Sequence, residues 1–547
     1  MKSFLLSVLL LVGVVISGAR ADVRLPGIFG SHMVLQQEAM LPVWGWADPG
    51  EKVTVSFGNV RANAIAGGDG KWRVDLPALR ANTPPGNLVV AGKNTLTLSD
   101  VLVGDVWICS GQSNMEFGLG GAIGGRDEIA RATDGNIRLF KVAHRDGIAP
   151  CDDVVGTWKV CSPQQVGDFS AVAYFFGKNL RASVGRPIGL IETAWSGSTA
   201  QAWTDKDSLL AGQSNPALKR YMDGYQKAVD AYPGGQAQLD AQVAEERVWR
   251  DRAGAEYNEA VKTWKAAVDQ AKARGQEPPP KPAAPPQGKW SPANPRTPTM
   301  LYNGMLAPLA PFAVKGVAWY QGEDNTGIPM AFEYRALLPT LIASWRAAFL
   351  QKDLPFLIVQ LPNIAPTSQN PGEPSPWAVL RESQLRTLTQ PNTGLTVTID
   401  LGDGNLHPPG KAHVGARLAL VARHVAYGED LVFSGPIYGS MKVEGNAIRI
   451  AFRPDSVGSG LVIGTSPRAL SAAAGDHLQG FVIAGNDRKW TVADAKIVGN
   501  EIVVSSPLVH LPVAVRYGWA QNPTCTLYNK EGLPASPFRT DDWPPFQ

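Results

Sequence analysis

The sequence has little charge, few cysteines and only one long apolar run. Charged residues make up 18% of the 547 residues, apolar residues make up 44%, and the formal net charge is +3. This balance excludes a largely disordered chain. No long basic run is present, which argues against nucleic acid and anionic membrane as partners. The length requires two or three domains with sizeable cores.

Cysteine and histidine are too sparse for a disulfide scaffold or a metal site. The four cysteines contain no CxxC pair and the seven histidines are scattered, so we expect no zinc and no other cofactor. Cys151 and Cys161 are near enough in sequence to close a loop if their geometry allows. Cys109 lies in an apolar run, which predicts a buried thiol.

The one long apolar run lies at the start of the chain. Lys2 gives a positive start, apolar residues follow from Phe4 to Ile16, and Ala19-Arg20-Ala21 has the small-x-small pattern of a cleavage site. The run is shorter than the ~20 residues of a membrane span, which disfavours the alternative of an uncleaved anchor. The sequence therefore predicts a signal peptide and a mature protein that is secreted or periplasmic, without membrane contact.

Two kinds of strand pattern follow. Up to about Asp100, apolar and polar residues alternate in short runs, which predicts antiparallel strands in a small sandwich. After Asp100, nearly continuous apolar runs such as Val101 to Cys109 and Val314 to Tyr320 alternate with segments of helix length. This predicts an α/β domain with a parallel sheet covered by helices. Strand patterns return after Asp430.

An insertion interrupts the α/β region. Ala, Gln, Glu, Lys and Arg dominate from Asp207 to Ala273, and a Pro-rich stretch follows from Pro278, so we expect a helical hairpin with a stiff return. A substrate wall and an excursion without function are both open interpretations. The predicted segments are a signal peptide (1–21), an N-terminal β domain (22–100), the two parts of the α/β domain (101–205 and 298–428), the insertion (206–297) and a C-terminal β domain (429–547).

Two of the predicted strand ends carry residues suited to acyl transfer. Ser113 in Gly111-Gln112-Ser113-Asn114 follows an apolar strand, at the edge where open α/β sheets bind ligands, with backbone N–H groups of the turn available to an oxyanion. Alone, this motif also fits a helix cap. A nucleophilic serine needs a base, and elimination among the histidines leaves His407, which follows another apolar strand.

Two further strand ends add polar groups. The amide of Gln321 can donate to an oxyanion without adding charge, and Gly197 allows close backbone approach and offers an N–H. Glu323 can orient Gln321 or stabilise a protonated histidine. Glu323 and Asp403 also fit the acid and base of a glycosidase, which is the rival interpretation.

Together these motifs resemble those of the sialate O-acetylesterase family, a branch of the GDSL/SGNH hydrolases. The matching segments are 33–37, 111–115, the Gly197 turn, 320–323, 400–403, 407–408, 515–520, 527–529 and 532–540. They occur in the right order and span nearly the whole mature chain except the insertion. The resemblance implies a flavodoxin-like three-layer α/β/α domain with flanking β-sandwich-like regions.

The resemblance also implies roles for single residues. Ser113 is the expected nucleophile and His407 the expected base. The expected oxyanion hole consists of the N–H groups of Ser113 and Gly197 and the side chain of Gln321. Other residues of the motifs are expected to support these groups or to bind substrate: Gln112, Asn114, Glu323 and Trp195.

The resemblance does not fix the acid of the triad. Related enzymes place it three or two residues before the histidine, and those positions hold Gly404 and Asn405 here. Asp403 is therefore our prediction for the acid, with Asp400 and Glu323 as alternatives.

The expected substrate is an acetylated carbohydrate. Sialate specificity requires a cationic clamp, and no arginine lies inside the motifs, although Arg126, Arg381 and Arg386 are available elsewhere. Exported members with an insertion also resemble plant cell-wall acetylesterases, including those acting on xyloglucan, and 16 tryptophans suit neutral sugar rings. We expect an acetylated hemicellulose oligosaccharide, with sialate as the alternative and a glycosidase or non-catalytic carbohydrate-binding protein as other classes. The oligomeric state is not predicted.

Overall fold

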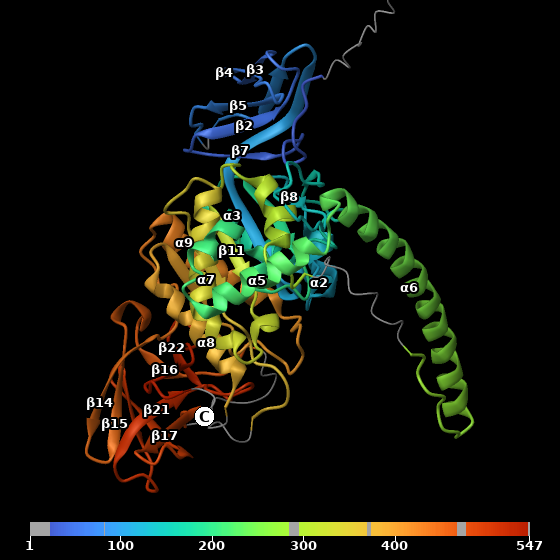
Figure 1. Cartoon of the computed structure of the whole chain (residues 1–547). Helices are drawn as coiled ribbons and strands as arrows, with labels where there is room; N and C mark the ends of the chain where they lie inside the picture. The colour runs from blue at the N-terminus through green and yellow to red at the C-terminus, as the bar shows by residue number, and fades with distance from the viewer. Residues whose placement is uncertain (1–21, 81–82, 284–294, 369–373, 468–476, 545–547) are drawn as a thin grey trace, which may run out of the picture.

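The computed structural model describes residues 22–80, 83–283, 295–368, 374–467 and 477–544. The predicted signal peptide, residues 1–21, lies outside this part. Within the described ranges, no helix is both long and apolar enough to cross a membrane. Figure 1 shows three bodies in a row, with a β domain at each end and an α/β domain between them.

The first body contains short strands, most of which pair antiparallel. Its strands are β1 (Val34–Gln36), β2 (Leu41–Trp46), β3 (Lys52–Phe57), β4 (Val60–Ile65), β5 (Lys71–Leu76) and β6 (Gly86–Ala91). β2 pairs with β5, while β3 pairs with β4 and β6. In β3 and β5 every second side chain is buried, because alternate residues of a strand face the core and the solvent.

The longest strand connects this domain to the next. β7 (Thr95–Gly111) pairs with β6 at its start and with the central sheet further on. Its residues alternate between exposed and half-buried up to Asp100 and are all buried from Val101 to Gly111. The predicted boundary at residue 100 therefore lies inside one continuous strand, where its burial pattern changes.

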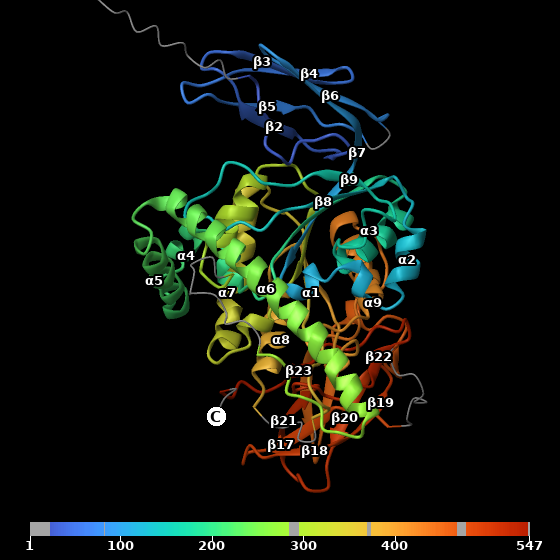
Figure 2. The same cartoon turned by 90° about the vertical axis from the view of Figure 1, so that its right-hand side faces the viewer.

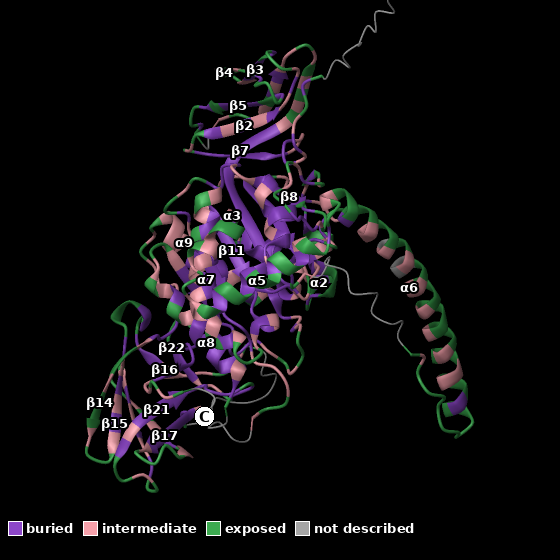
Figure 3. Cartoon of the chain, in the orientation of Figure 1, coloured by how far each residue is buried: buried purple, intermediate pink, exposed green. Residues whose placement is uncertain are grey.

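The central domain is built on a mostly parallel sheet, in the order β13-β12-β11-β7-β10-β8-β9. Its other strands are β8 (Ile137–Lys141), β9 (Trp158–Val160), β10 (Ile188–Ala194), β11 (Gly316–Tyr320), β12 (Phe356–Val359) and β13 (Thr393–Thr396). Only β9 at the edge pairs antiparallel. Apart from β9, the strands are buried along their whole length except at some ends, as parallel strands covered on both faces must be (Figure 3).

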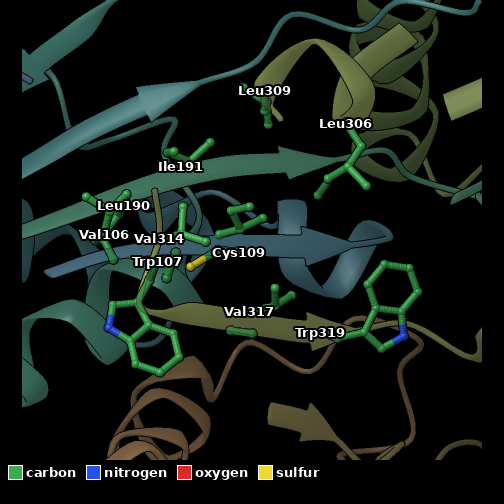
Figure 4. Close-up of a cluster of buried hydrophobic side chains, with 14 of the residues drawn as sticks. Val106, Trp107, Cys109, Leu190, Ile191, Leu306, Leu309, Val314, Val317 and Trp319 are labelled. Carbon is green, nitrogen blue, oxygen red and sulfur yellow. The ribbon is translucent and has the colours of Figure 1, made fainter. Parts of the chain in front are cut away.

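Helices cover both faces of this sheet, which gives the predicted three layers. The helices are α1 (Ser113–Glu116), α2 (Gly125–Arg131), α3 (Ala171–Val184), α7 (Met330–Ala348), α8 (Pro376–Arg386) and α9 (Lys411–Tyr427). α3 packs on one face, where Phe176 contacts Trp107. α7 packs on the other, where Trp345 contacts Trp319. Figure 4 shows part of this core on β7, β10 and β11.

The insertion forms three helices rather than the predicted hairpin. They are α4 (Lys206–Ala211), α5 (Pro216–Asp230) and α6 (Gly235–Ala273). α4 and α5 pack against α7 and bury apolar residues such as Leu209 and Leu218. α6 is a single 39-residue helix that stands away from the body (Figure 1). Figure 2, in which α6 faces the viewer, shows it running diagonally across the front of the view.

The last body is a second β domain. Its strands are β14 (Tyr438–Glu444), β15 (Ala447–Phe452), β16 (Leu461–Ile463), β17 (Phe481–Gly485), β18 (Trp490–Val492), β19 (Asp494–Val498), β20 (Glu501–Ser505), β21 (Pro512–Tyr517), β22 (Leu527–Asn529) and β23 (Phe538–Arg539). They form two four-stranded sheets and a two-stranded ribbon. Ile450, Ile483 and Val515 from these sheets share one buried cluster.

All four cysteines are free thiols. The loop closure considered for Cys151 and Cys161 is therefore absent. Cys109 is buried in β7 as predicted, and burial raises the pKa of its thiol far above the ordinary value.

Candidate active site

Ser113 lies just beyond the carboxyl end of the central strand. β7 ends at Gly111, where φ is +139° and an added Cβ would lie 2.0 Å from the carbonyl oxygen of Tyr320, so the site admits only glycine. Gln112 follows, and Ser113 is the first residue of α1. Its side chain is half-buried. The strand end and the start of the helix thus place the hydroxyl at the edge of the sheet that binds ligands in this class of fold.

His407 reaches Ser113 from the loop that precedes α9. Its Nε2 lies 2.8 Å from Ser113 Oγ, although the two residues are 294 positions apart in sequence. The hydroxyl donates to Nε2 when the ring proton is on Nδ1. Asn114 Nδ2 donates to the carbonyl of Leu406 at 3.0 Å, which ties the histidine loop to α1. The expected nucleophile and base are therefore in contact.

The surroundings of His407 favour its neutral form. Burial lowers the pKa of His407 below its ordinary value of 6.5, and the nearby Lys411 ammonium lowers it further. A neutral imidazole is the form that accepts a proton from serine. The ring is therefore prepared to act as a base at neutral pH.

The backbone N–H groups of Ser113 and Gly197, at this edge, have no acceptor among the residues that the structure describes. Gly197 has φ of +72° in the turn after β10, and the N–H of Trp195 donates to Gly111 O at 3.1 Å, which fixes this turn beside the end of β7. Unpaired N–H groups at a helix start and in a glycine turn are suited to bind an oxyanion.

Gln321 does not present a free amide in this arrangement. The residue is fully buried, and its Nε2 lies 2.8 Å from Asn325 Oδ1 and 3.1 Å from both Gln112 Oε1 and the Ser198 carbonyl. Its Oε1 accepts from the hydroxyl of Tyr334 at 2.8 Å. Two amide hydrogens with three protein acceptors leave no donor for an oxyanion. Gln321 joins three strand ends instead, which does not match the role we expected for it.

No described carboxylate is hydrogen bonded to His407. Asp403 is exposed, and its Oδ1 accepts from the N–H of Asn405 at 3.1 Å. Asp400 is held by Arg417, whose two terminal nitrogens donate to its two oxygens at 2.6 and 2.7 Å. The structure therefore brings Ser113 and His407 together but adds neither aspartate to the pair.

A buried polar cluster supports the catalytic pair from behind. Asn114 Nδ2 donates to Glu323 Oε1 at 2.5 Å, and Lys411 Nζ donates to Asn114 Oδ1. Burial raises the pKa of Glu323 to about 7, although the Asn114 hydrogen bond and the Lys411 charge act in the opposite direction. The Lys411 ammonium also lies 5.0 Å from the ring centre of Phe117. Sequence reasoning missed Lys411, whose only signal is its place four residues after His407.

A second polar group on α1 ties it to the turn after β10. Glu116 Oε2 accepts from the N–H and the hydroxyl of Ser196, at 2.7 and 2.5 Å, and its Oε1 lies 2.8 Å from His144 Nε2. Burial acts to raise the pKa of Glu116, but the hydrogen bonds from His144 and Ser196 outweigh it and the pKa is lowered. Of this group only the neighbouring Trp195 was predicted. His144 has no informative neighbours in sequence and becomes recognisable only where the ends of β8 and β10 meet.

The arginines considered for an acidic sugar are engaged elsewhere or lie on the surface. Arg381 is fully buried and donates only to backbone carbonyls. Arg386 pairs with a glutamate of its own helix, and Arg126 is exposed on α2. A cation that the motifs did not suggest is Arg296, whose Nε donates to Asp324 Oδ1 at 2.9 Å. The described residues also contain no cluster of three or more His, Cys, Asp or Glu side chains suited to a metal ion.

The chain is similar to known carbohydrate esterases. A family model described as a carbohydrate esterase, sialic acid-specific acetylesterase, matches residues 287–423. The crystal structure of a carbohydrate acetylesterase from Xanthomonas citri is 38% identical, covers 95% of this chain and 100% of its own, and has a TM-score of 0.75. The chain belongs to the sialate O-acetylesterase family of carbohydrate esterases.

Curated members of the family match along nearly their whole length. Sialate O-acetylesterase of Rattus norvegicus is 28% identical over 582 residues, with 97% of each chain covered. The Homo sapiens protein is 26% identical over 563 residues, which cover 94% of this chain and 92% of its own. Membership in the family confirms the predicted resemblance and the esterase fold. It identifies the protein as a carboxylic ester hydrolase of acetylated carbohydrate and sets aside the glycosidase and non-catalytic interpretations.

Proposed function

We propose that this carbohydrate esterase is exported and removes acetyl groups from hemicellulose oligosaccharides of the xyloglucan type through an acetyl-enzyme intermediate on Ser113. The observation that carries the mechanism is the 2.8 Å contact between Ser113 Oγ and His407 Nε2. Export is inferred from the apolar run and cleavage pattern of residues 1–21.

The first half of the reaction acylates the serine. Ser113 Oγ attacks the carbonyl carbon of the acetyl ester while its proton passes to His407 Nε2. The carbonyl oxygen becomes an oxyanion, for which the N–H groups of Ser113 and Gly197 are the donors. The tetrahedral intermediate then collapses, the bond from carbon to the sugar oxygen breaks, and His407 returns its proton to the departing sugar hydroxyl.

The second half releases acetate. A water molecule attacks the carbonyl carbon of the acetyl-enzyme and gives a proton to His407 Nε2, through the same oxyanion site. Collapse breaks the bond to Ser113 Oγ, which takes the proton back from His407. The products are acetic acid, which ionises at neutral pH, and the regenerated enzyme. Asp403 remains our prediction for the group that orients His407 during these transfers.

A neutral sugar is favoured because the cations near the site are already engaged. Lys411 is 1% exposed and donates to Asn114. Arg296 is paired with Asp324. A sialate carboxylate would have to displace such a pairing, whereas a neutral sugar needs no counterion. Sialate remains the second candidate, because the curated relatives are named sialate O-acetylesterases.

The proposal is tested by acetate release from acetylated xyloglucan oligosaccharide, O-acetylated sialic acid and p-nitrophenyl acetate. We expect the highest kcat/KM among the two sugars on the xyloglucan oligosaccharide, and the reverse order would move the assignment to sialate. Ser113→Ala should lower all three activities by at least about 10³-fold. Ser183→Ala, at an exposed position on α3, is the matched control and should behave as the wild type. A folded Ser113→Ala enzyme that keeps a tenth of its activity would refute the nucleophile.

A further inference from the structure

Glu116 connects the two elements that supply the backbone donors. It lies three residues after Ser113 on α1, and its carboxylate binds both the N–H and the hydroxyl of Ser196. Ser196 immediately precedes Gly197. The carboxylate therefore fixes the distance between the turn after β10 and the helix that begins at the nucleophile, and with it the relative position of the N–H groups of Ser113 and Gly197.

The same carboxylate holds an aromatic pair beside this turn. His144 Nε2 lies 2.8 Å from Glu116 Oε1 and 3.1 Å from the carbonyl of Ala194. The imidazole is stacked on the indole of Trp195, with ring centroids 4.2 Å apart and an angle of 6° between the planes. Trp195 is half-buried and the His144 side chain is 36% exposed. The two nearly parallel, stacked rings thus reach solvent two residues away from Gly197.

The protonation of His144 follows from its contacts. Nε2 faces two acceptors, a carboxylate oxygen and a carbonyl oxygen, so it carries a hydrogen. The other ring nitrogen, Nδ1, has no partner among the residues that the structure describes. The pair therefore offers a partly exposed aromatic surface with one unused polar atom at its edge. Stacking on an aromatic ring combined with a nearby hydrogen bond suits a sugar ring, which has apolar C–H faces and a rim of hydroxyls.

We propose that His144 and Trp195 form a subsite for a sugar ring of the substrate, and that Glu116 is a positioning residue that holds this subsite in register with Ser113. The proposal rests on the function proposed above and adds where the carbohydrate binds. Substrate binding on the rings then places the acetyl group against the donors of the same turn, because one carboxylate fixes both. A bare acetyl ester has no ring to place there and does not use the subsite.

The first experiment compares the specificity of variants. We expect Trp195→Ala and His144→Ala to lower the ratio of kcat/KM for acetylated xyloglucan oligosaccharide to kcat/KM for p-nitrophenyl acetate by tenfold or more, mainly through KM for the oligosaccharide. Trp46→Ala removes another half-buried tryptophan, in the N-terminal β domain, and should leave the ratio at the wild-type value. Equal ratios in wild type, Trp195→Ala and His144→Ala would overturn the subsite.

The second experiment separates Glu116 from a general role in stability. Glu116→Ala should lower kcat on both substrates at least tenfold, because the turn that carries Gly197 is released. Glu116→Gln should restore most of that kcat, since its amide oxygen still accepts from the N–H of Ser196. Wild-type kcat in Glu116→Ala, or equal losses in the Ala and Gln variants, would contradict the positioning role.

A binding measurement distinguishes failure of the subsite from failure of the proposed function. Calorimetric titration of Ser113→Ala with acetylated xyloglucan oligosaccharide does not require turnover. Adding Trp195→Ala to that variant should raise the Kd for the oligosaccharide tenfold or more. If Trp195→Ala weakens oligosaccharide binding but the activity does not depend on Ser113, the subsite is supported and the proposed mechanism is refuted. Unchanged binding would refute the subsite, whatever the activity.

Discussion

His407 lies where burial and a neighbouring cation act in the same direction. Both lower the pKa of His407 below 6.5, so the neutral base persists to lower pH than it does for an exposed histidine. We therefore expect the acidic limb of the kcat/KM profile on p-nitrophenyl acetate to lie below pH 6.5. The profile is measured at constant ionic strength between pH 4.5 and 9. An acidic limb above pH 6.5 would show that the charged form of the ring is stabilised in the free enzyme, contrary to this expectation.

Lys411 provides the charge-dependent part of that effect. Lys411→Met keeps the length of the side chain and removes the ammonium, so the acidic limb should move to higher pH. The direction is the test, because loss of packing alone would lower activity at every pH. Lys315→Met is a matched control, since its ammonium also lies over an aromatic ring, that of Tyr427, away from the catalytic pair.

Asp403 is our prediction for the carboxylate that orients His407. If Asp403 orients His407 in the reacting complex, Asp403→Asn should lower kcat at least about 10²-fold with little change in KM. Asp400→Asn is the comparison, and it should act mainly on stability, because Asp400 is bound by Arg417. Near-normal kcat in Asp403→Asn, with a collapse of kcat in Asp400→Asn or Glu323→Gln, would move the role to the other carboxylate.

The contrast between the catalytic pair and its supporting residues has a physical cause. Ser113 and His407 follow apolar strands, and the ends of parallel strands converge on one edge, so residue order was enough to bring them together. The acid and the amide donor depend on where single side chains point within loops. Asp403 turns to its own backbone, and Gln321 is consumed by neighbours on other loops. No pattern in the sequence indicates which partners these two side chains bind.

Among the elements, β8 is a buried strand whose apolar pattern is interrupted by a charged residue. Arg138 lies inside it, is 5% exposed and donates to Asp100 at 2.8 Å. A buried, paired arginine is rare enough that a charged residue normally indicates surface. β7 was predicted correctly from Val101 onwards, but its continuity with the preceding domain depends on pairing with β6.

The insertion divides into a packed base and a free arm. α4 and α5 bury Leu209, Leu218 and Tyr225, so removing residues 207–289 would expose part of the core. The informative deletion replaces residues 243–290, which leaves Leu239 and its small buried cluster in place. Figure 2 shows α6 on the same side of the molecule as α1. We therefore expect the arm to contact the distal part of a long substrate.

Deletion of most of α6 should change substrate specificity. With a short Gly/Ser linker in place of residues 243–290, kcat/KM should fall several-fold on acetylated oligosaccharide and stay at the wild-type value on p-nitrophenyl acetate, which is too short to reach α6. A linker inserted after Gly499, in the exposed turn between β19 and β20, is the control. If the deletion variant treats both substrates as the wild type does, the arm has no part in substrate binding.

At the scale of the whole molecule, tryptophan content was a weak guide to sugar binding. Several of the largest fully buried side chains are tryptophans, including Trp107, Trp203, Trp319 and Trp345. These rings fill the layers on either side of the central sheet, where large apolar area contributes most to stability. Trp195 differs because it is half-buried at the catalytic edge. Composition does not distinguish core tryptophans from a tryptophan at the catalytic edge, whereas the fold does.

One buried arginine connects the α/β domain to the C-terminal β domain. Arg381 of α8 donates to the carbonyls of Leu361 and Pro362 at 2.9 and 2.7 Å, and to those of Ala520 and Gln521 at 2.7 and 3.0 Å. Burial lowers the pKa of Arg381 to about 9, which still leaves it charged at neutral pH. The guanidinium is therefore stabilised by four backbone dipoles, two from each side of the domain boundary.

This arrangement predicts that Arg381 fixes the two domains together. Arg381→Met leaves the buried carbonyls of Leu361 and Ala520 without a donor, while those of Pro362 and Gln521 still accept from Trp377 and Ile364. The loss should cost about 3 kcal/mol and lower Tm by several degrees. Arg381→Lys should rescue little, because an ammonium has three donors and no planar fork to reach both domains. Arg386→Met, on the same helix with its side chain 55% exposed, is the matched control and should change Tm by less than 1 °C. Calorimetry of the full chain also reports whether the domains unfold separately, and we expect the single transition of the wild type to split in Arg381→Met. A variant that melts as one unit at the temperature of Arg386→Met would show that the apolar contacts between the domains suffice without this cation.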